Sequence, residues 1–393
     1  MRFLHTSDWH LGRTLEGRSR QAEQEEFLEE ICQLADEEKI DAVLVAGDVF
    51  DAFNPSAVAE QLFFDAMDRL AAGGKRAVVV IAGNHDSPDR LVAASPLARR
   101  HGIVLLGLPG DGPPKPATAN QSVCSISGGS SWLELSVPGR DHTAVLLTLP
   151  YPSESRLKEL LHDSLEDEAA AQQAYTYRIG RFFSQLANKY RSDTVNLALG
   201  HIYVQGGLTS DSERPLFSIG GASTVLSGDL PQGAQYVALG HLHRPQAVEG
   251  VSAPCRYSGS PLAYSFSEAG QAKSVVVADI TPGQPAEIRE IHLSSGCPLV
   301  RWQATKGVAQ VYRWLNEGRD RRAWIDLEIT VDAPLSIQDV QQLRKACSRF
   351  IDIRVLYPGQ SVESQRHSLA GLPIDELFAI FYERKYGLKP DEK

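Results

Sequence analysis

The chain of 393 residues is long enough for two or three domains. Its apolar fraction of 42% and charged fraction of 22% are ordinary for a folded protein, which excludes collagen-like, low-complexity and wholly disordered classes. The net charge of −10, from 39 basic and 49 acidic residues, disfavours a free-standing nucleic-acid-binding protein, although a bound metal or a partner subunit can supply positive charge locally.

The cysteine and hydropathy patterns restrict the compartment. Five scattered cysteines without a C-x-x-C motif indicate neither a disulfide framework nor a zinc-thiolate site, and they fit a reducing cytoplasm. No apolar run approaches the roughly 20 residues needed to span a bilayer, so we expect no membrane partner. The N-terminal stretch MRFLHTSDWH predicts a strand, and we expect no signal peptide.

The first half of the chain alternates predicted strands with predicted helices. Apolar runs at 2–7, 42–46 and 77–82 predict buried strands, and helical spacing fills 19–39 and 57–70. This β-α-β-α-β order predicts parallel strands with right-handed crossovers.

The elements that follow are a loop at 109–122, a strand at 144–149, a long helix at 164–190 and buried strands at 195–199 and 236–239.

The predicted elements become shorter in the last third of the chain. A hairpin is predicted over 274–293, after which strands and helices alternate on a smaller scale. We therefore predict a main domain at 1–295, a small α+β domain at 296–358, and a tail at 359–393. The tail contains a polar linker and an amphipathic helix at 373–386.

Side chains that can bind a metal follow five of the predicted strands. Because ligands bind beyond the carboxyl ends of parallel strands, we expect these segments to lie together. Each motif alone more often forms a turn or a pair of polar side chains that hydrogen-bond each other, but the combination of all five favours a metal site. The segments are Asp8-Trp9-His10, Gly47-Asp48, Gly83-Asn84-His85-Asp86, Gly200-His201 and Gly240-His241-Leu242-His243.

The residue types in these segments indicate a pair of cations. Carboxylate, amide and imidazole ligands without a thiolate suit two octahedral divalent ions such as Mn²⁺, Fe²⁺ or Zn²⁺. Ions about 3.5–4 Å apart need a bridging carboxylate, for which Asp48 is the natural candidate. Such a pair clamps a phosphate and lowers the pKa of a bridging water. The predicted ligands are Asp8, His10, Asp48, Asn84, His201, His241 and His243.

With these motifs the chain resembles the calcineurin-like metallophosphoesterases, and more closely the bacterial SbcD branch of the Mre11/SbcD nucleases. The resemblance implies an α/β fold, a β-sandwich flanked by helices in four layers, followed by a small α+β capping and DNA-binding domain and a C-terminal helical tail. It is carried by HTSDWHLG at 5–12, VAGDVFD at 45–51, IAGNHDS at 81–87, ALGHLHRPQ at 238–246 and YSGSPLAYSF at 257–266.

The resemblance also implies roles for single residues. His85 is the expected catalytic histidine, which stabilises or protonates the leaving group, and Asp86 is its expected orienting partner. An alternative for His85 is a hydrogen-bonding residue beside the ligands. Archaeal and eukaryotic relatives often have a histidine at the position of Asp51, so no role is carried over to that residue. The implied ion sites are Asp8, His10 and His243 for the first, Asn84, His201 and His241 for the second, with Asp48 shared.

The implied function is that of a Mn²⁺-dependent DNA phosphodiesterase, the nuclease subunit of an SbcCD-type complex in DNA repair, recombination and replication. Such an enzyme combines 3′→5′ exonuclease action on duplex ends with endonuclease action on single strands and hairpins. The ligands alone leave open a metallophosphoesterase acting on small phosphodiesters or phosphoproteins. A further alternative is a non-catalytic DNA-end tether.

The resemblance implies three kinds of partner. DNA is the expected substrate, which would place the protein at the nucleoid, and phosphate contacts are expected from Arg13, Arg18, Arg20 or Arg244. An SbcC-like ATPase of the SMC family is expected to bind the C-terminal helix. A homodimer through the helical regions 57–70 and 88–97 would give a heterotetramer with that ATPase.

Overall fold

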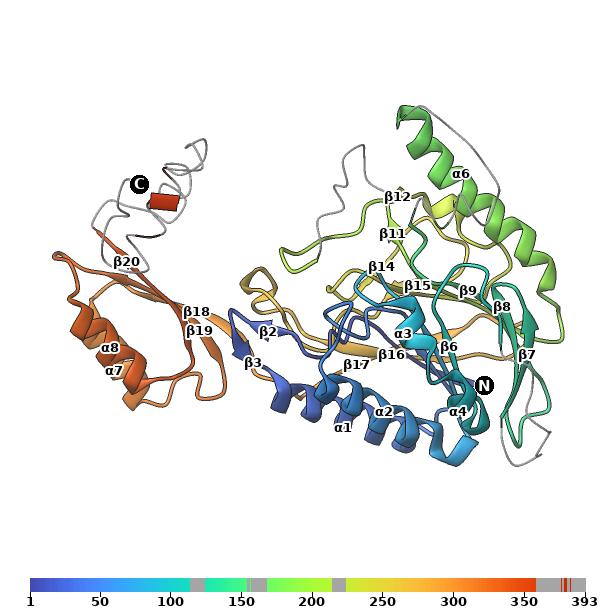
Figure 1. The fold of residues 1–393 in the computed structure, drawn as a ribbon, viewed down its shortest axis with the longest axis horizontal. Coiled ribbons are helices and arrows are strands. Elements are labelled where there is room, and N and C mark those ends of the chain that lie inside the picture. The colour runs from blue at the N-terminus through green and yellow to red at the C-terminus, as the bar shows by residue number, and fades with distance from the viewer. Residues whose placement is uncertain are drawn as a thin grey trace. The chain divides into compact units, whose positions relative to one another are not determined.

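The chain divides into two compact units, Met1–Pro298 and Leu299–Lys393, each with its own core (Figure 1). Most of the predicted tail lies outside the described residues, so the division of the chain into three parts stays a prediction. The computed structural model describes residues 1–113, 124–153, 156, 168–213, 224–357, 376, 378–379 and 382.

The first sheet of the first unit contains the strands predicted at 2–7, 42–46 and 77–82, and they pair in parallel as expected. The predicted hairpin joins the same sheet in antiparallel fashion, and β6 is an additional parallel strand that the sequence analysis missed. In spatial order the strands are β17 (Glu287–His292), β16 (Ser274–Asp279), β1 (Arg2–Thr6), β4 (Ala42–Val45), β5 (Ala77–Ile81) and β6 (Ile103–Leu106).

The second sheet has a parallel centre and antiparallel strands at both edges. Its predicted strands at 144–149, 195–199 and 236–239 are confirmed. The second of these ends at the predicted ligand His201, and the third ends at Gly240, directly before the predicted ligand His241. In spatial order the strands are β14 (Gln246–Ala247), β15 (Cys255–Tyr257), β13 (Tyr236–Gly240), β10 (Val195–His201), β9 (Ala144–Leu149), β8 (Trp132–Ser136) and β7 (Ser125–Gly129).

The two sheets pack face to face and helices cover their outer faces. Side chains such as Phe3 and Leu44 of one sheet and Leu146 and Leu197 of the other form a closed apolar layer. The outer layers are α1 (Gln21–Glu37) and α2 (Ala57–Ala71) on the first sheet and α6 (Glu168–Leu186) on the second (Figure 1). The predicted four-layer β-sandwich is therefore confirmed.

Within the apolar layer one polar side chain links the sheets. The ring of His5 on β1 lies 2.8 Å from the hydroxyl of Tyr236 and 3.1 Å from the carbonyl oxygen of Leu239, both on β13. Because a carbonyl only accepts, Nε2 carries the proton and the tyrosine donates to Nδ1. Burial lowers the pKa of His5 to about 3, which keeps the ring neutral. The two strands are thereby tied together a few residues before their ends.

The second unit is a small domain with one three-stranded sheet and two helices among its described residues. Its three strands are parallel, and one helix follows each of the first two. The core contains Trp302, Leu327, Leu343 and Phe350. The elements are β18 (Leu299–Ala304), α7 (Val308–Asn316), β19 (Trp324–Thr330), α8 (Ile337–Ala346) and β20 (Phe350–Leu356).

The remaining elements are short. Among the described residues, no helix has both the length and the apolar character required to cross a membrane. The short strands are β2 (Thr14–Leu15), β3 (Arg18–Ser19), β11 (Tyr203–Val204) and β12 (Thr224–Val225). The short helices are α3 (Pro88–Val92), α4 (Ser95–Ala98) and the 3₁₀ turns at Ala72–Gly74, Arg99–His101, Ala187–Lys189, Ser227–Asp229 and Phe266–Glu268.

A buried arginine fastens the outer helices to the first sheet. Arg76, just before β5, donates to the carbonyl oxygens of Ala35 and Leu70 near the ends of α1 and α2, at 3.0 and 2.9 Å. It also donates to the carbonyl of Ile40 at 3.0 Å. The last carbonyls of a helix have no partner within the helix, so a cation there is favourable.

We predict that Arg76→Met destabilises the first unit, because the carbonyls of Ile40, Leu70 and Ala35 each lose a hydrogen bond from the guanidinium group and its ion pair with Asp36 is lost as well. The expected loss is about 3 kcal/mol of unfolding free energy, measured by urea denaturation. The matched control is Arg69→Met, which removes an exposed ion pair with Glu29 and should cost less than about 1 kcal/mol. Equal losses for the two variants would contradict this account.

Candidate metal centre

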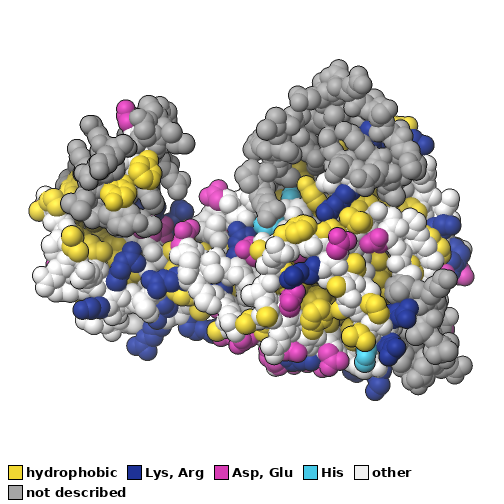
Figure 2. Space-filling view, in the orientation of Figure 1, with side chains coloured by type: hydrophobic (Ala, Val, Ile, Leu, Met, Phe, Trp, Pro, Cys, Tyr) yellow, Lys and Arg dark blue, Asp and Glu magenta, His cyan; other side chains and the backbone are white. Residues whose placement is uncertain are grey.

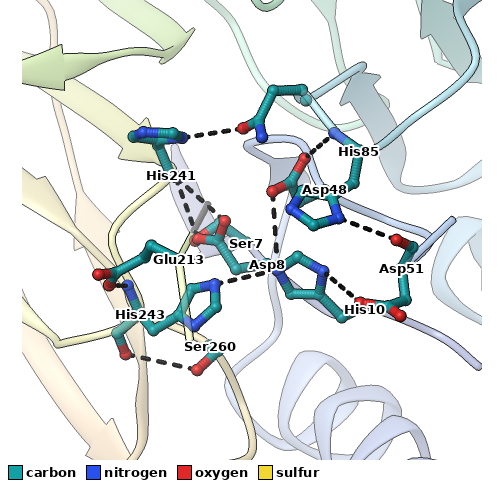
Figure 3. Close-up of polar contacts among 12 residues, drawn as sticks. Ser7, Asp8, His10, Asp48, Asp51, His85, Glu213, His241, His243 and Ser260 are labelled. Carbon is teal, nitrogen blue, oxygen red and sulfur yellow. Dashed lines mark hydrogen bonds and ion pairs between the residues drawn. The ribbon is translucent and has the colours of Figure 1, made fainter. Parts of the chain in front are cut away.

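The five predicted segments meet at one place. Loops after β1, β4 and β5 of the first sheet face loops after β10 and β13 of the second, and their polar side chains converge (Figure 3). Most of these side chains are withdrawn from solvent: Asp8, His10 and His201 are 0% exposed, and Asp48 is 2% exposed.

The residues predicted for the first ion form one cluster. Ligand atoms of Asp8, His10 and His243 all lie within 4.8 Å of one another. The two Nε2 atoms of His10 and His243 are 3.0 Å apart, so the two rings point at the same small volume. The carboxylate of Asp8 is held by the hydroxyl of Ser7 at 2.6 Å and by the backbone amide of His241.

The residues predicted for the second ion form another cluster. The Oδ1 atom of Asn84 is 2.9 Å from Nε2 of His201 and 2.9 Å from Nδ1 of His241. These two ring nitrogens are 3.3 Å apart. Three donor atoms, two from loops and one from the last residue of β10, therefore surround a single point.

Asp48 lies between the clusters. Its Oδ2 atom is 3.6 Å from Nε2 of His10, and its Oδ1 atom is 3.6 Å from Nε2 of His201. One carboxylate thus turns one oxygen to each cluster, which is the arrangement a shared ligand requires.

The electrostatics of the clusters fit a pair of cations. Burial and the nearby charge of Asp48 raise the pKa of Asp8 well above its usual range. Burial lowers the pKa of His241 to about 3, so its ring is neutral and offers a lone pair. Divalent cations would compensate the buried carboxylates, and these ligands are of the types such ions take.

The backbone is strained at the same residues. Asp8, His10, Asp48 and His241 all have positive φ angles, at 54°, 45°, 49° and 109°. Such conformations cost about 1–3 kcal/mol each for a residue with a side chain, and they concentrate at functional sites. The orientation of these four side chains is therefore achieved at a cost in the free energy of folding.

Two glycines allow the loops to approach this closely. A Cβ atom at Gly83 would lie 2.0 Å from Oδ1 of Asp48, and one at Gly240 would lie 1.9 Å from the carbonyl oxygen of Ala46. Neither position can accept a side chain without displacing the site.

Backbone and side-chain acceptors fix the histidine tautomers. Nδ1 of His201 donates to the carbonyl oxygen of Ala46 at 2.7 Å, which leaves the lone pair of Nε2 directed at Asn84. Nδ1 of His243 lies 2.6 Å from the hydroxyl of Ser212. No motif in the sequence pointed to Ser212, because it lies on an irregular segment far from any predicted strand end.

His85 lies beside the first cluster. Its ring centroid is 4.7 Å from that of His10, and its backbone amide donates to Asp48 at 2.9 Å. The ring nitrogen Nδ1 donates to the backbone carbonyl of Asp51 at 2.8 Å. The side chain of Asp51 also faces Nδ1 of His10 at 3.5 Å. No role was expected for Asp51 from the sequence, and a contact through its backbone carbonyl cannot be predicted from the residue type.

Asp86 has partners other than the ring of His85. Its carboxylate accepts from the backbone amides of Val49, Phe50 and Gly83, at 3.1, 2.9 and 2.8 Å. Burial and the nearby Asp48 raise the pKa of Asp86 to about 7. In the structure this residue joins the loop after β4 to the loop after β5. The orienting role expected for it toward His85 stays a prediction.

The predicted phosphate-binding arginines differ in exposure. Arg18 and Arg244 are exposed, and Arg13 is half-buried with a hydrogen bond to the carbonyl of Ser212 at 2.8 Å. Arg20 is 1% exposed and paired with Glu23, so it is enclosed in the fold and cannot contact DNA. On the described part of the face in Figure 2, acidic and basic side chains are interspersed over the first unit.

We predict that Gly83→Ala abolishes binding of the two metal ions, because the added methyl group displaces the Asp48 carboxylate. Metal content after dialysis against Mn²⁺ measures this. The control is Gly228→Ala, where a Cβ meets nothing within 4 Å, and it should bind metal like the parent. Normal metal content in the Gly83 variant would show that Asp48 is not a ligand.

Comparison with known proteins agrees with this geometry. Residues 1–245 match the calcineurin-like phosphoesterase family. The chain is 48% identical to the SbcCD nuclease D subunit of Bacillus subtilis, covering 100% of this chain and 95% of that protein. It is 30% identical to the Escherichia coli protein of the same name, covering 96% and 92%. The Rhodobacter capsulatus protein of that name is 34% identical, covering 77% and 72%. The chain therefore belongs to the calcineurin-like phosphoesterases and, among them, to the family of SbcCD nuclease D subunits.

Proposed function

We propose that the chain is the nuclease subunit of an SbcCD-type complex and hydrolyses DNA phosphodiester bonds with two divalent cations, which we take to be Mn²⁺. The observation that carries this proposal is the position of Asp48, with one carboxylate oxygen 3.6 Å from a histidine of each cluster. When bound, the two cations would hold a phosphate, lower the pKa of a water and stabilise charge on the leaving oxygen. Near full-length similarity to SbcCD nuclease subunits supports DNA as the substrate.

The proposed ion sites are those of the two clusters. Asp8, His10 and His243 hold one ion, and Asp48 is shared. Asn84, His201 and His241 hold the other. All donor atoms are oxygen or nitrogen, which suits Mn²⁺.

In this proposal His85 protonates the leaving group. Because its Nδ1 donates to the carbonyl of Asp51, the ring exchanges protons with substrate through Nε2. The contact also fixes the plane of the ring beside His10. A protonated ring gives its Nε2 proton to the leaving oxygen, and the neutral ring then takes up a proton from solvent water to complete the cycle.

We predict that His85→Ala keeps both ions and loses most of the nuclease activity, since no ligand atom is removed. Loss of such a group lowers the rate by about 10²–10⁴-fold. Metal content and cleavage of a labelled duplex with Mn²⁺ are measured on the same sample. His101→Ala, an exposed histidine away from the clusters, is the control. Cleavage at the parental rate would refute the role of His85.

The decisive substrate experiment uses one metal-loaded preparation on several substrates. A hairpin, a blunt duplex and a single strand are compared with a small phosphodiester and a phosphopeptide, with and without an SbcC-like ATPase and ATP. We expect 3′→5′ degradation of duplex ends and cutting of hairpins and single strands. Cleavage of the small phosphodiester or phosphopeptide alone would support a different phosphoesterase. DNA binding without any cleavage would support the tether.

We further propose an SbcC-like ATPase as partner and a homodimer, giving a heterotetramer. The relatives are named as subunits of SbcCD, which supports the ATPase. In the helical regions proposed for the dimer, Phe63 and Leu91 belong to the core, whereas Phe64 and Leu97 are 43% and 67% exposed. Contact with a second copy would bury the apolar surface that Phe64 and Leu97 expose.

The ATPase contact is proposed for the helix at 373–386, which lies almost wholly outside the described residues. We predict that truncation after Gln360 leaves a folded, metal-loaded enzyme that cuts simple substrates. The truncated chain should fail to co-purify with the ATPase and lose ATP-dependent cleavage, because an amphipathic helix needs a groove for its apolar face. Complex formation at undiminished affinity would place the contact elsewhere.

A further inference from the structure

Behind the proposed ligand His243 lies a buried row of polar side chains that no motif contains. Ser212, Glu268 and Lys273 come from separate segments, and they are 6%, 0% and 9% exposed. They connect to Nδ1 of His243, the ring nitrogen that points away from the first cluster. The direction of each hydrogen bond in this row follows from the donors and acceptors available.

Lys273 marks the charged end of the row. Its Nζ atom donates to the carbonyl oxygen of His243 at 2.9 Å, to the hydroxyl of Ser260 at 3.1 Å and to Oε2 of Glu268. Ser260 gives its own proton to the carbonyl oxygen of Leu262 at 2.8 Å, so all three neighbours of Nζ accept, and only an ammonium group has three donors for them. Lys273 is therefore a cation, and Glu268 is the carboxylate that balances it.

Glu268 can only accept hydrogen bonds in this state. Its Oε1 atom receives the backbone amides of Tyr264 and Ser265, both at 3.1 Å, and lies 2.5 Å from the hydroxyl of Ser212. Two oxygens 2.5 Å apart need a proton between them, and a carboxylate has none to give, so the single hydroxyl proton of Ser212 points to Glu268. In its 2.8 Å contact with the hydroxyl of Ser210, Ser212 therefore accepts.

The same proton cannot also serve His243. The hydroxyl oxygen of Ser212 presents only lone pairs to Nδ1 of His243, 2.6 Å away, so Nδ1 carries the proton. The opposite nitrogen, Nε2, is then unprotonated and faces Nε2 of His10 at 3.0 Å. His201 reaches the same state through the backbone carbonyl of Ala46, whereas His243 depends on side chains.

We propose that Lys273, Glu268 and Ser212 are positioning residues that fix His243 in the tautomer and ring orientation needed to bind the first cation. The proposal rests on the proposed two-metal function, which it deepens. These residues act through His243 and do not contact substrate. Hydrogen bonds behind a metal ligand typically change metal affinity 10–100-fold.

The test is a calorimetric titration of the full-length chain with Mn²⁺. Ser212→Ala removes the acceptor for Nδ1 and should weaken one of the two binding steps by about 10–100-fold, leaving the other unchanged. Ser212→Thr keeps the hydroxyl and should restore the parental affinity. Ser252→Ala, an exposed serine, is the control for the substitution itself. Two unchanged binding steps in Ser212→Ala would overturn the proposal.

A second measurement needs no variant at position 212. In the chain loaded with diamagnetic Zn²⁺ and labelled with ¹⁵N-histidine, long-range ¹H–¹⁵N spectra report which nitrogen of His243 carries the proton, with His243→Gln identifying the signals. Protonated Nδ1 is expected, and protonated Nε2 would overturn the proposal even if Ser212→Ala does not fold. A parent chain that binds two ions but cuts no DNA would refute the proposed function and leave this inference standing.

Discussion

The structure depends on the burial of two carboxylates and four histidines in one small volume where two sheets meet. Asp8 and Asp48 lie in a medium that solvates neither, and burial and the charge of Asp48 raise the pKa of Asp8. For Asp48 the neighbouring His201 and His85 outweigh the effect of burial and lower the pKa. Four of the residues in the site also have positive φ angles. Electrostatic and conformational penalties thus fall on the same loops, and bound cations are the simplest means of offsetting both.

The fold makes this concentration of ligands achievable. Parallel strands bring successive loops to one edge of a sheet, and packing two such sheets face to face brings two edges together. The contact between His5 and the carbonyl oxygen of Leu239 links β1 to β13 just before their loops begin. Gly83 and Gly240 then remove the side chains that would keep the loops apart. Outside the site, Arg76 holds the covering helices against the sheet.

The features predictable from the sequence were those with a local signature. Continuous apolar runs identified β1, β4, β5, β9, β10 and β13, because strands buried on both faces have no polar side. The strands β7 and β8 were missed. β7 reads SISGG, which has neither an apolar run nor strong strand propensity, and it is stabilised by its pairing with β8. The two strands form a hairpin closed at Ser130 and Ser131, a turn without the Asn-Gly or Asp-Gly pair that usually marks such hairpins in a sequence.

The candidate site shows the same division. Ligand types placed after strands were visible in the sequence, but the groups that orient them were not. Ser212 and Glu268 lie 56 residues apart and meet only in three dimensions, and Asp51 acts on His85 through its backbone. Arg20 was predicted as a surface cation because it neighbours a motif. It is buried because Glu23, one helical turn later, pairs with it and also accepts the amide of Cys297.

The most direct test of a shared Asp48 is a crystal structure of the chain grown with Mn²⁺, with anomalous differences recorded to locate the ions. The account predicts two peaks on opposite sides of the Asp48 carboxylate, about 3.5–4 Å apart, one beside His10 and His243 and the other beside His201 and His241. A single peak, or two ions that do not share Asp48, would contradict it.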